Sequence, residues 1–437
     1  MIEKITEIVN KYKIPVSDNF QKSEIPLDSD LSKMIPAIRM TVSSDKINTI
    51  QYYSSTKVKS IIQSNQSFLQ HISTQPDDIL NFIKTNTLFV AKDQKLPEIL
   101  TQLTGFFSAN NQYPLFLAIE NVGIIAISEN ALTNLIIINL FQFIVKEEVL
   151  NTSSFSYPSP SQIKRTEQKI IIVTGGAQGF GEGIVQDLFD NGANIIIADI
   201  NEQKGQDLVK KLNSSGVLNK ACFVKTDITQ HASVQNMVIE AVRHFGGIDC
   251  LISNAGILIA GGLDDLTAEA FDKVTQVNYY GYFNVSKYVS EVLKIQAAVK
   301  PNYFTDIIQI SSKSGLQGSN RNFAYAGSKF GGIGLTQSFA LELVEYNIKV
   351  NSICPGNFFD GPLWSDPDRG LFVQYLNTGK VPGAKTIADV KKFYESKVPM
   401  KRGCTVADVM KAVLYIMDQN YETGQAIAVT GGQVMLH

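Results

Sequence analysis

Residues 170–181 read IIIVTGGAQGFG, a β-branched run that leads straight into a glycine-rich turn. The residues that follow, EGIVQDLFDNG, have the apolar spacing of a helix. Gly175, Gly179 and Gly181 allow a tight turn, close approach of a pyrophosphate to the backbone and close packing of the helix on the sheet. The N–H groups at the start of such a helix attract phosphate. Strand, turn and helix together predict a dinucleotide-binding unit.

Further short apolar runs recur along the chain, separated by amphipathic stretches. They span residues 194–198, 221–224, 250–253, 307–310, 349–353 and 426–429. Continuous apolar runs indicate strands that are buried on both faces, as in a parallel sheet covered by helices. We therefore expect residues 167–437 to form one doubly wound parallel α/β domain of the Rossmann type.

A chain of 437 residues is too long for one ordinary domain. The stretch NTSSFSYPSPSQ opens a predicted linker over residues 151–166. Residues 1–150 are expected to form a smaller mixed α/β accessory domain, with apolar runs at 87–91 and 114–119. The apolar segment 131–145 contains Asn134, Asn139 and Gln142 and falls short of the roughly 20 residues that span a bilayer, so we interpret it as a buried helix.

Composition excludes several classes of function. The 39 Lys and Arg residues against 41 Asp and Glu leave no basic surplus for a nucleic acid or an anionic membrane, so neither partner is expected. Four cysteines without a CxxC pair and four scattered histidines argue against a disulfide framework and a metal site. The N-terminus, MIEKITEIVNKYK, lacks the apolar core of a secretory signal, which favours a cytoplasmic protein.

The second expected strand ends in Ala198-Asp199-Ile200, about 20 residues beyond the glycine-rich turn. A carboxylate there accepts hydrogen bonds from the adenosine ribose and repels a 2′-phosphate, which predicts NAD rather than NADP as the cofactor. The alternative is a solvated Asp at a strand end.

Tyr325 and Lys329 share one face of an expected helix, because they lie four residues apart. A nearby ammonium, reinforced by an oxidised nicotinamide, favours the phenolate and makes the tyrosine a usable base. Taken alone, this spacing also fits an ordinary surface pair.

In order and spacing, the C-terminal part resembles the short-chain dehydrogenase/reductase family throughout its length. The resemblance implies a catalytic set of Asn278 in VNYYG, Ser312 in ISSKSG, Tyr325 and Lys329. Ser312 is preferred to Ser311 because it lies three residues before Gly315 and thirteen before the tyrosine. The implied cofactor-binding residues are Gly175, Gln178, Gly179, Phe180, Gly181, Asp199, Ile200, Asp227, Ile228, Asn254, Ala255, Gly256, Tyr325, Lys329, Pro355 and Gly356.

The resemblance also implies a mechanism of hydride transfer between the nicotinamide and a carbinol or carbonyl carbon. Tyr325 exchanges the hydroxyl proton, Ser312 bonds the substrate oxygen, Lys329 holds the nicotinamide ribose and Asn278 fixes a water. One position departs from the family pattern, since Asp360 stands where many relatives carry a threonine that bonds the carboxamide.

From Gln309 to the C-terminus the chain resembles the sorbitol-6-phosphate 2-dehydrogenases, through strings such as QISSKSG, SKFGGIGLTQS and KVPMKRGC. This resemblance implies NAD-dependent interconversion of D-sorbitol 6-phosphate and D-fructose 6-phosphate. Cations at Lys313, Arg321, Lys401 and Arg402 are candidate substrate ligands, or ordinary solvated charges. Residues 357–398 correspond to the family's substrate lid, where Phe358, Phe359 and Trp364 either wall the pocket or form the core of the lid.

Two alternatives to this function stay open at the level of sequence. The chain could be a dehydrogenase of another polyol or hydroxy-sugar, or an NAD(H)-sensing regulator on a dehydrogenase fold. The complete set of Asn278, Ser312, Tyr325 and Lys329 argues against the regulator. A homo-oligomer, dimer or tetramer, is expected.

Residues 1–150 resemble the class II aldolase-type regions that precede such dehydrogenases in bifunctional enzymes. The strings are QPDDILNFIKTNTLFVAKD and PLFLAIENVGIIAISENALTNLIIINLFQFI. His71 is the only histidine of this half, so a metal site of three histidines cannot form there. We expect a packing or oligomerisation module without catalysis, with a sugar-sensing role as the alternative.

Overall fold

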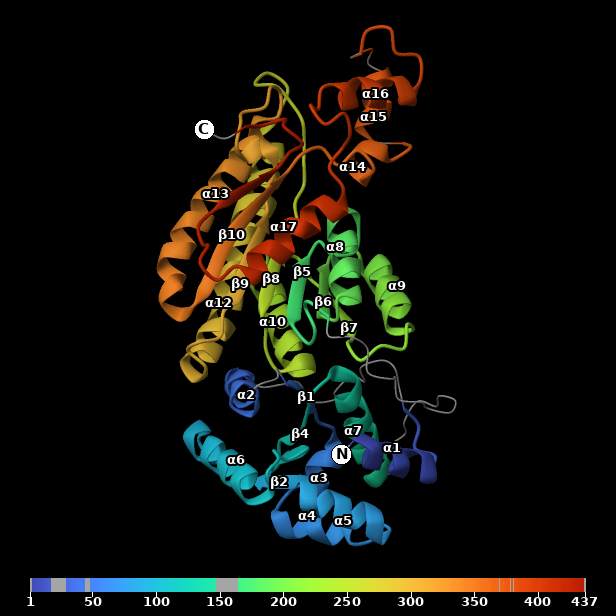
Figure 1. Ribbon diagram of the computed structural model, residues 1–437, viewed down its shortest axis with the longest axis vertical. Helices are drawn as coiled ribbons and strands as arrows, with labels where there is room; N and C mark the ends of the chain where they lie inside the picture. The colour runs from blue at the N-terminus through green and yellow to red at the C-terminus, as the bar shows by residue number, and fades with distance from the viewer. Residues whose placement is uncertain are drawn as a thin grey trace.

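The computed structural model describes residues 2–16, 29–43, 48–146, 164–368, 370–377, 379 and 381–435. The expected linker at 151–166 lies almost wholly outside these residues. The described residues form two α/β units, one built on a four-stranded sheet and the other on a seven-stranded sheet. In Figure 1 the first unit lies below the second, and a small group of helices lies at the far end of the second unit.

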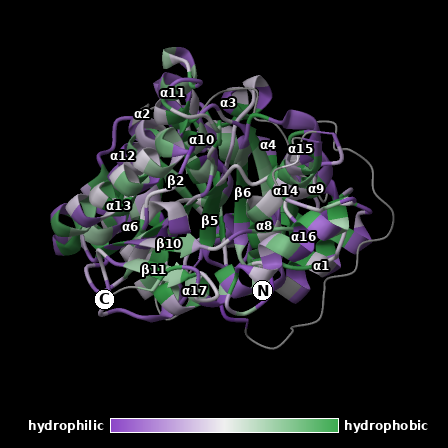
Figure 2. Ribbon diagram, turned by 90° about the horizontal axis from the view of Figure 1, so that it is seen from above, coloured by the Kyte–Doolittle hydropathy of each residue, from purple (hydrophilic) through white to green (hydrophobic). Residues whose placement is uncertain are grey.

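The larger sheet confirms the expected doubly wound parallel fold. Its strands are β5 (Ile170–Thr174), β6 (Asn194–Asp199), β7 (Ala221–Lys225), β8 (Cys250–Ser253), β9 (Thr305–Ile310), β10 (Ile348–Pro355) and β11 (Ala426–Val429). Their order is β11-β10-β9-β8-β5-β6-β7 and every neighbouring pair is parallel. Each strand overlaps one of the runs from which it was expected. Figure 2 shows β5 and β6 as hydrophobic strands enclosed between helices.

Helices cover both faces of this sheet. One face carries α10 (His231–Phe245), α12 (Gly281–Val299) and α13 (Phe323–Leu343), and the other carries α8 (Gly179–Asp190), α9 (Glu202–Asn213) and α17 (Val406–Asp418). Shorter elements are α11 (Ala268–Thr275), the π-helical turn η1 (Gln276–Tyr280), and the 3₁₀ turns η2 (Lys313–Gly315) and η3 (Val344–Tyr346). The alternation of strands and helices places all carboxyl ends of the strands at one edge of the sheet.

The smaller sheet has the order β1-β4-β3-β2. Its strands are β1 (Thr49–Tyr53), β2 (Thr87–Val90), β3 (Phe116–Ile119) and β4 (Gly123–Ser128). Its helices are α1 (Ile2–Lys11), α2 (Ser29–Val42), α3 (Thr56–Ile61), α4 (Asn65–Ile72), α5 (Asp77–Asn86), α6 (Leu96–Asn110) and α7 (Ala131–Ile144). The buried helix expected at 131–145 is α7, whereas β1 and β4 were not predicted.

One buried hydrophobic cluster spans both units. Ile50 and Tyr52 of β1 belong to the same buried cluster as Val242 and Phe245 of α10. Helix α2 packs on α12 and α10, and β1 packs on α10. Gly246, with φ +88°, lets this approach occur, because a Cβ there would lie 2.6 Å from Cβ of Ile50. These contacts favour the packing interpretation of the N-terminal unit.

The contact between the units lies at the edge of the sheet opposite the carboxyl ends of the strands. Arg39 of α2 reaches Asp249, the residue before β8, and Nζ of Lys300 donates to the carbonyl of Ser43 at 2.8 Å. The described residues contain no helix that is long and apolar enough to cross a membrane.

Candidate active site

The glycine-rich turn lies at the carboxyl end of β5 and opens α8. Gly175 and Gly179 have φ of +62° and +63°, a backbone conformation that favours glycine. A Cβ on Gly181 would lie 2.0 Å from the carbonyl oxygen of Gly175, so the start of α8 can approach the turn only with glycine there. Gln178 at the N-cap makes no side-chain cap bond, which leaves the first N–H groups of α8 available to a phosphate.

Asn254 holds the turn from the neighbouring strand β8. Its Nδ2 donates to the carbonyls of Thr174 at 3.1 Å and Gly175 at 3.0 Å. A Cβ on Gly175 would lie 2.8 Å from Cα of Ala255, so the two loops are in direct contact. The expected cofactor residues from these two strands are therefore brought together at one edge of the sheet.

Asp199 ends β6, and its carboxylate is directed at the turn rather than into solvent. Oδ2 accepts from the N–H of Ala177 at 3.0 Å and Oδ1 accepts from the N–H of Asn201 at 2.9 Å. The side chain is 7% exposed, which disfavours the alternative of a solvated strand-end residue. Ile200, the next residue, is 69% exposed beside it.

Asp227 and Ile228 follow β7 and make different contacts. Oδ1 of Asp227 accepts from the N–H of Thr229 at 2.9 Å and from its hydroxyl at 2.7 Å. Ile228 is buried against Gly281, and its carbonyl accepts from Nδ2 of Asn284 at 2.8 Å. The predicted contact of Ile228 with a cofactor would therefore come from its backbone N–H rather than its side chain.

Ser312, Tyr325 and Lys329 meet at the carboxyl end of β9. The phenol of Tyr325 lies near Ser312, whose side chain interacts with it and acts to lower its pKa, and Nζ of Lys329 lies 5.6 Å from the centre of the Tyr325 ring. Nζ of Lys329 also donates to the carbonyl of Ile310 at 2.9 Å. Ser311 turns elsewhere, because its hydroxyl donates to the carbonyl of Lys329 at 3.4 Å. The structure therefore brings Ser312, and not Ser311, to the phenol.

Burial shapes the ionisation of this group. It raises the pKa of Tyr325 above its ordinary value, and the interaction with Ser312 acts in the opposite direction. Burial also lowers the pKa of Lys329 to about 8. The ammonium alone therefore does not bring the phenol to a neutral pKa, and the expected lowering requires a further positive charge.

Asn278 fixes the loops around the catalytic helix. It lies in the π-turn η1, a distortion that is frequent at functional sites. Its Oδ1 accepts from the N–H of Ile257 at 2.8 Å, and its Nδ2 donates to the carbonyl of Ile257 at 2.8 Å and to Oγ of Ser328 at 3.1 Å. Ser328 in turn donates to the carbonyl of Tyr325 at 2.8 Å. Ser328 was not singled out from sequence, although it directly precedes Lys329.

The segment after β10 carries the expected lid, which contains α14 (Pro362–Ser365), α15 (Leu371–Asn377) and α16 (Ile387–Ser396). The ring of Trp364 lies 5.0 Å from that of Phe359 and 5.1 Å from those of Phe372 and Tyr394. Phe359 is 2% exposed and Trp364 is 8% exposed. Of the two interpretations, the structure therefore supports lid core for both residues.

The candidate substrate cations differ in their partners. Arg321 pairs with Asp265, and Arg402 donates to both carboxylate oxygens of Asp408 at 2.6 and 2.9 Å. Nζ of Lys401 donates to the carbonyl of Ser396 at 2.7 Å. Lys313 directly follows Ser312 and is half-buried, which lowers its pKa, and it pairs with no residue in the described part of the chain. Asp360 is also engaged, in an ion pair with Lys391 at 2.8 Å.

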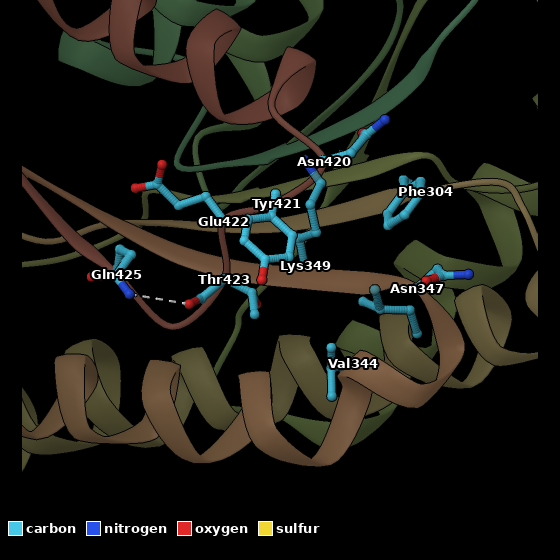
Figure 3. A pocket seen from close by; sticks show the side chains of 10 residues that line it. Phe304, Val344, Asn347, Lys349, Asn420, Tyr421, Glu422, Thr423 and Gln425 are labelled. Atoms are coloured by element: carbon cyan, nitrogen blue, oxygen red, sulfur yellow. Dashed lines mark hydrogen bonds between the residues drawn. The ribbon is translucent and has the colours of Figure 1, made fainter.

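Two cavities lie away from Tyr325. One of about 460 Å³ contains Lys349 and Tyr421 in its wall, at the amino end of β10 (Figure 3). It is thus at the opposite end of that strand from Pro355. A second of about 500 Å³ lies beside β11 and includes Arg402 and Cys404. Within the described residues, no group of three or more His, Cys, Asp or Glu side chains could hold a metal ion.

A seven-stranded parallel sheet with a phosphate-binding turn and a Ser-Tyr-Lys group defines a nicotinamide-dependent oxidoreductase. Residues 169–363 match the family model described as short chain dehydrogenase, and the chain belongs to this family. Members of the family typically bind NAD or NADP, and the glycine cradle between β5 and α8 fits such a dinucleotide. Pro355 ends β10 and Gly356 follows it at the same edge of the sheet.

Among individual proteins, the chain is similar to sorbitol-6-phosphate 2-dehydrogenase of Escherichia coli, with 35% identity over 61% of this chain and 99% of that protein. It is 32% identical to galactitol 2-dehydrogenase of Agrobacterium fabrum, over 62% of this chain and 99% of that protein. The crystal structure of sorbitol-6-phosphate 2-dehydrogenase from Erwinia amylovora covers 61% of this chain and 100% of its own, with 35% identity and a TM-score of 0.55. None of these matches supports the resemblance of residues 1–150 to aldolases, which stays a prediction.

Proposed function

We propose that the protein is an NAD-dependent dehydrogenase that interconverts a sugar-alcohol phosphate and a keto-sugar phosphate, D-sorbitol 6-phosphate and D-fructose 6-phosphate being the favoured pair. The observation that carries the proposal is the grouping of Ser312, Tyr325 and Lys329 at the carboxyl end of β9, with Nζ of Lys329 5.6 Å from the centre of the phenol ring. Lys313, a cation that pairs with no residue in the described part of the chain, directly follows the serine. The similarity to two polyol dehydrogenases supports the substrate class.

The catalytic group has a definite task in polyol oxidation. Tyr325 takes the proton of the substrate hydroxyl, while the hydroxyl of Ser312 donates a hydrogen bond to the same oxygen. Lys329, with a pKa of about 8, is mostly protonated at pH 7, and its charge favours the phenolate. When bound, the nicotinamide supplies the acceptor for the hydride that leaves the carbinol carbon. In the reverse direction, Tyr325 returns the proton to the ketone oxygen.

The preference for NAD rests on Asp199. Its carboxylate is already fixed by the N–H of Ala177 in the turn and by the N–H of Asn201 after β6, in a position to accept hydrogen bonds from ribose hydroxyls. The same negative charge repels a 2′-phosphate. The diphosphate would be held at the start of α8 by the turn that contains Gly175, Gly179 and Gly181. Asn254 stabilises this turn by donating hydrogen bonds to the carbonyls of Thr174 and Gly175.

The preference for a phosphorylated polyol rests on Lys313. A half-buried ammonium without a partner in the described residues is a stronger ligand for an anion than one that is already paired. Arg402 and Arg321 are each held by a carboxylate, so they are weaker candidates. An unphosphorylated polyol is the second candidate, favoured by the similarity to galactitol 2-dehydrogenase.

The test is an assay of NADH formation with the purified full chain and matched pairs of polyols and polyol phosphates. We expect kcat/KM to be highest for sorbitol 6-phosphate and to fall when NAD is replaced by NADP. Preference for a free polyol would select the second candidate. Absence of turnover together with tight NAD(H) binding would instead favour the sensing regulator.

A further inference from the structure

The lid touches the phosphate-binding turn through two stacked phenylalanine rings. Phe180 is the second residue of α8, and Phe358 lies three residues beyond the end of β10. Their ring centres are 4.1 Å apart and the ring planes differ by 17°, which is the geometry of a stacked pair. Phe180 follows β5 and Phe358 follows β10, so the two rings come from segments that are 178 positions apart in sequence (358 − 180).

Phe358 is held in this position by its own segment. The N–H of Asn357 donates to Oε1 of Gln433 at 3.2 Å, and its carbonyl accepts from the N–H of Cys404 at 2.8 Å. The N–H of Gly361 donates to the carbonyl of Phe358 at 3.1 Å. A Cβ on Gly361 would lie 2.4 Å from Cδ1 of Phe358, so the turn admits the ring only with glycine at that position.

The next residue connects this segment to the interior of the lid. Phe359 is buried against Trp364 at 5.0 Å and Phe372 at 5.7 Å. Adjacent residues therefore place one ring on the phosphate-binding turn and the other in the lid core. Pro362, which begins α14, makes a second contact, with its Cδ 3.6 Å from the place a Cβ on Gly179 would occupy.

We propose that Phe358 is a positioning residue that ties the packing of the lid to the state of the phosphate-binding turn through its stack on Phe180. The inference rests on the proposed function, because it requires a dinucleotide diphosphate at the turn. When the diphosphate contacts the first N–H groups of α8, Phe180 is fixed with them. The stack then fixes Phe358, Phe359 and the aromatic core of the lid above the substrate.

The chain contains an intrinsic fluorophore that can report the coupling between the phosphate-binding turn and the lid. Trp364 is the only tryptophan in the sequence, and its ring contacts Phe359. The emission of Trp364 therefore reports the packing of the lid core. ADP-ribose is a suitable probe, because it carries the diphosphate and lacks the nicotinamide that would quench or absorb.

The experiment titrates the full chain with ADP-ribose and records Trp364 emission, with calorimetry measuring binding independently. We expect emission to change on binding in the parent protein and the change to be largely lost in Phe358→Ala, which should still bind ADP-ribose with an affinity within about tenfold of the parent, because the coupling is reciprocal. The KM for the polyol should rise about two- to tenfold in this variant, the range that a stacked aromatic pair supports, with a smaller change in kcat. Phe358→Tyr should restore both properties.

Two further variants complete the test. Phe358→Leu keeps apolar volume without a ring, so it reports the stack even if alanine disturbs folding. Phe393→Ala removes a lid ring that lies 5.4 Å from Tyr394 and should keep the response to ADP-ribose. The proposal is overturned if Phe358→Ala or Phe358→Leu responds as the parent does, or if the parent binds ADP-ribose without a change in emission. If calorimetry detects no binding of ADP-ribose or NAD, the proposed function fails and this inference falls with it.

Discussion

The guanidinium of Arg39 donates two hydrogen bonds to the carboxylate of Asp249, at 3.0 and 2.7 Å, across 210 residues of sequence. Both side chains are fully buried between the two units. Burial opposes the charge of Asp249, but the guanidinium of Arg39 beside it holds the pKa of this carboxyl below its usual range. Asp249 also accepts from the hydroxyl of Tyr303 and from the N–H of Ile170, the first residue of β5. The N-terminal unit thus contributes to the structure of the dehydrogenase sheet.

Replacement of Arg39 by Met should therefore destabilise the whole chain. Asp249 would be left as a buried carboxylate without its main counter-charge, which costs about 3–5 kcal/mol. Urea unfolding followed by circular dichroism would measure the loss. Arg165→Met is a matched control, because Arg165 pairs with Asp418 at an exposed position and should matter little. Equal stabilities of the Arg39→Met and parent proteins would contradict a structural role for the pair.

Asp199→Ala should relax the preference for NAD over NADP. The variant removes the negative charge that repels a 2′-phosphate and keeps Lys204, whose ammonium donates to Oε1 of Gln178 at the turn. We expect the ratio of kcat/KM for NAD to that for NADP to fall by about tenfold or more. Steady-state kinetics with both cofactors provide the measurement, and an unchanged ratio would remove Asp199 as the selector.

Tyr325→Phe should abolish most turnover while the fold and cofactor binding are kept. The phenol is the only proton acceptor proposed for the substrate hydroxyl, and positioned proton transfer is worth about 10²- to 10⁴-fold in rate. Calorimetric titration with NAD would show retained binding. Tyr421→Phe is a control, because Tyr421 is 99% exposed and lies at the other end of the sheet. Near-parental kcat in Tyr325→Phe would refute the mechanism.

Lys313→Ala should raise KM for a polyol phosphate far more than for the free polyol. Loss of one charge-assisted hydrogen bond to phosphate corresponds to about 10- to 100-fold in KM. Arg402→Ala is the comparison, since that side chain is already paired with Asp408 at the start of α17 and should change stability more than phosphate selectivity. Equal effects of Lys313→Ala on both substrates would exclude Lys313 as the phosphate ligand.

Stability should fall as the pH drops below 6.5, because of His244. Burial, together with the nearby charge of Arg243, lowers the pKa of this histidine from 6.5 to about 4. Between these values the unfolded chain binds more protons than the folded one, so protonation favours unfolding. His244→Gln should flatten the dependence of the urea midpoint on pH from 6.5 to 4. A parental slope in that variant would show that other groups are responsible.

The sequence by itself predicted the parallel sheet and most of the candidate site. Most of its seven strands are largely apolar because both faces are covered by helices, and that pattern is visible without any tertiary information, although β10 carries Lys349 and Asn351. Tyr325 and Lys329 are related by helical spacing. Asp199 ends β6 and Asn254 directly follows β8, and the carboxyl ends of these parallel strands must meet at one edge. Such relations are local, or follow from the topology of a doubly wound sheet.

Only the tertiary structure decided the contacts that depend on the approach of distant segments. In the sequence Arg39 is an ordinary cation of an amphipathic segment, and nothing near it indicates a fully buried partner at Asp249. Aromatic residues of the lid could equally face substrate or one another, and packing placed Phe359 and Trp364 in its core. The stack of Phe358 on Phe180 likewise exists because the backbone brings two loops together, which no local pattern of residues encodes.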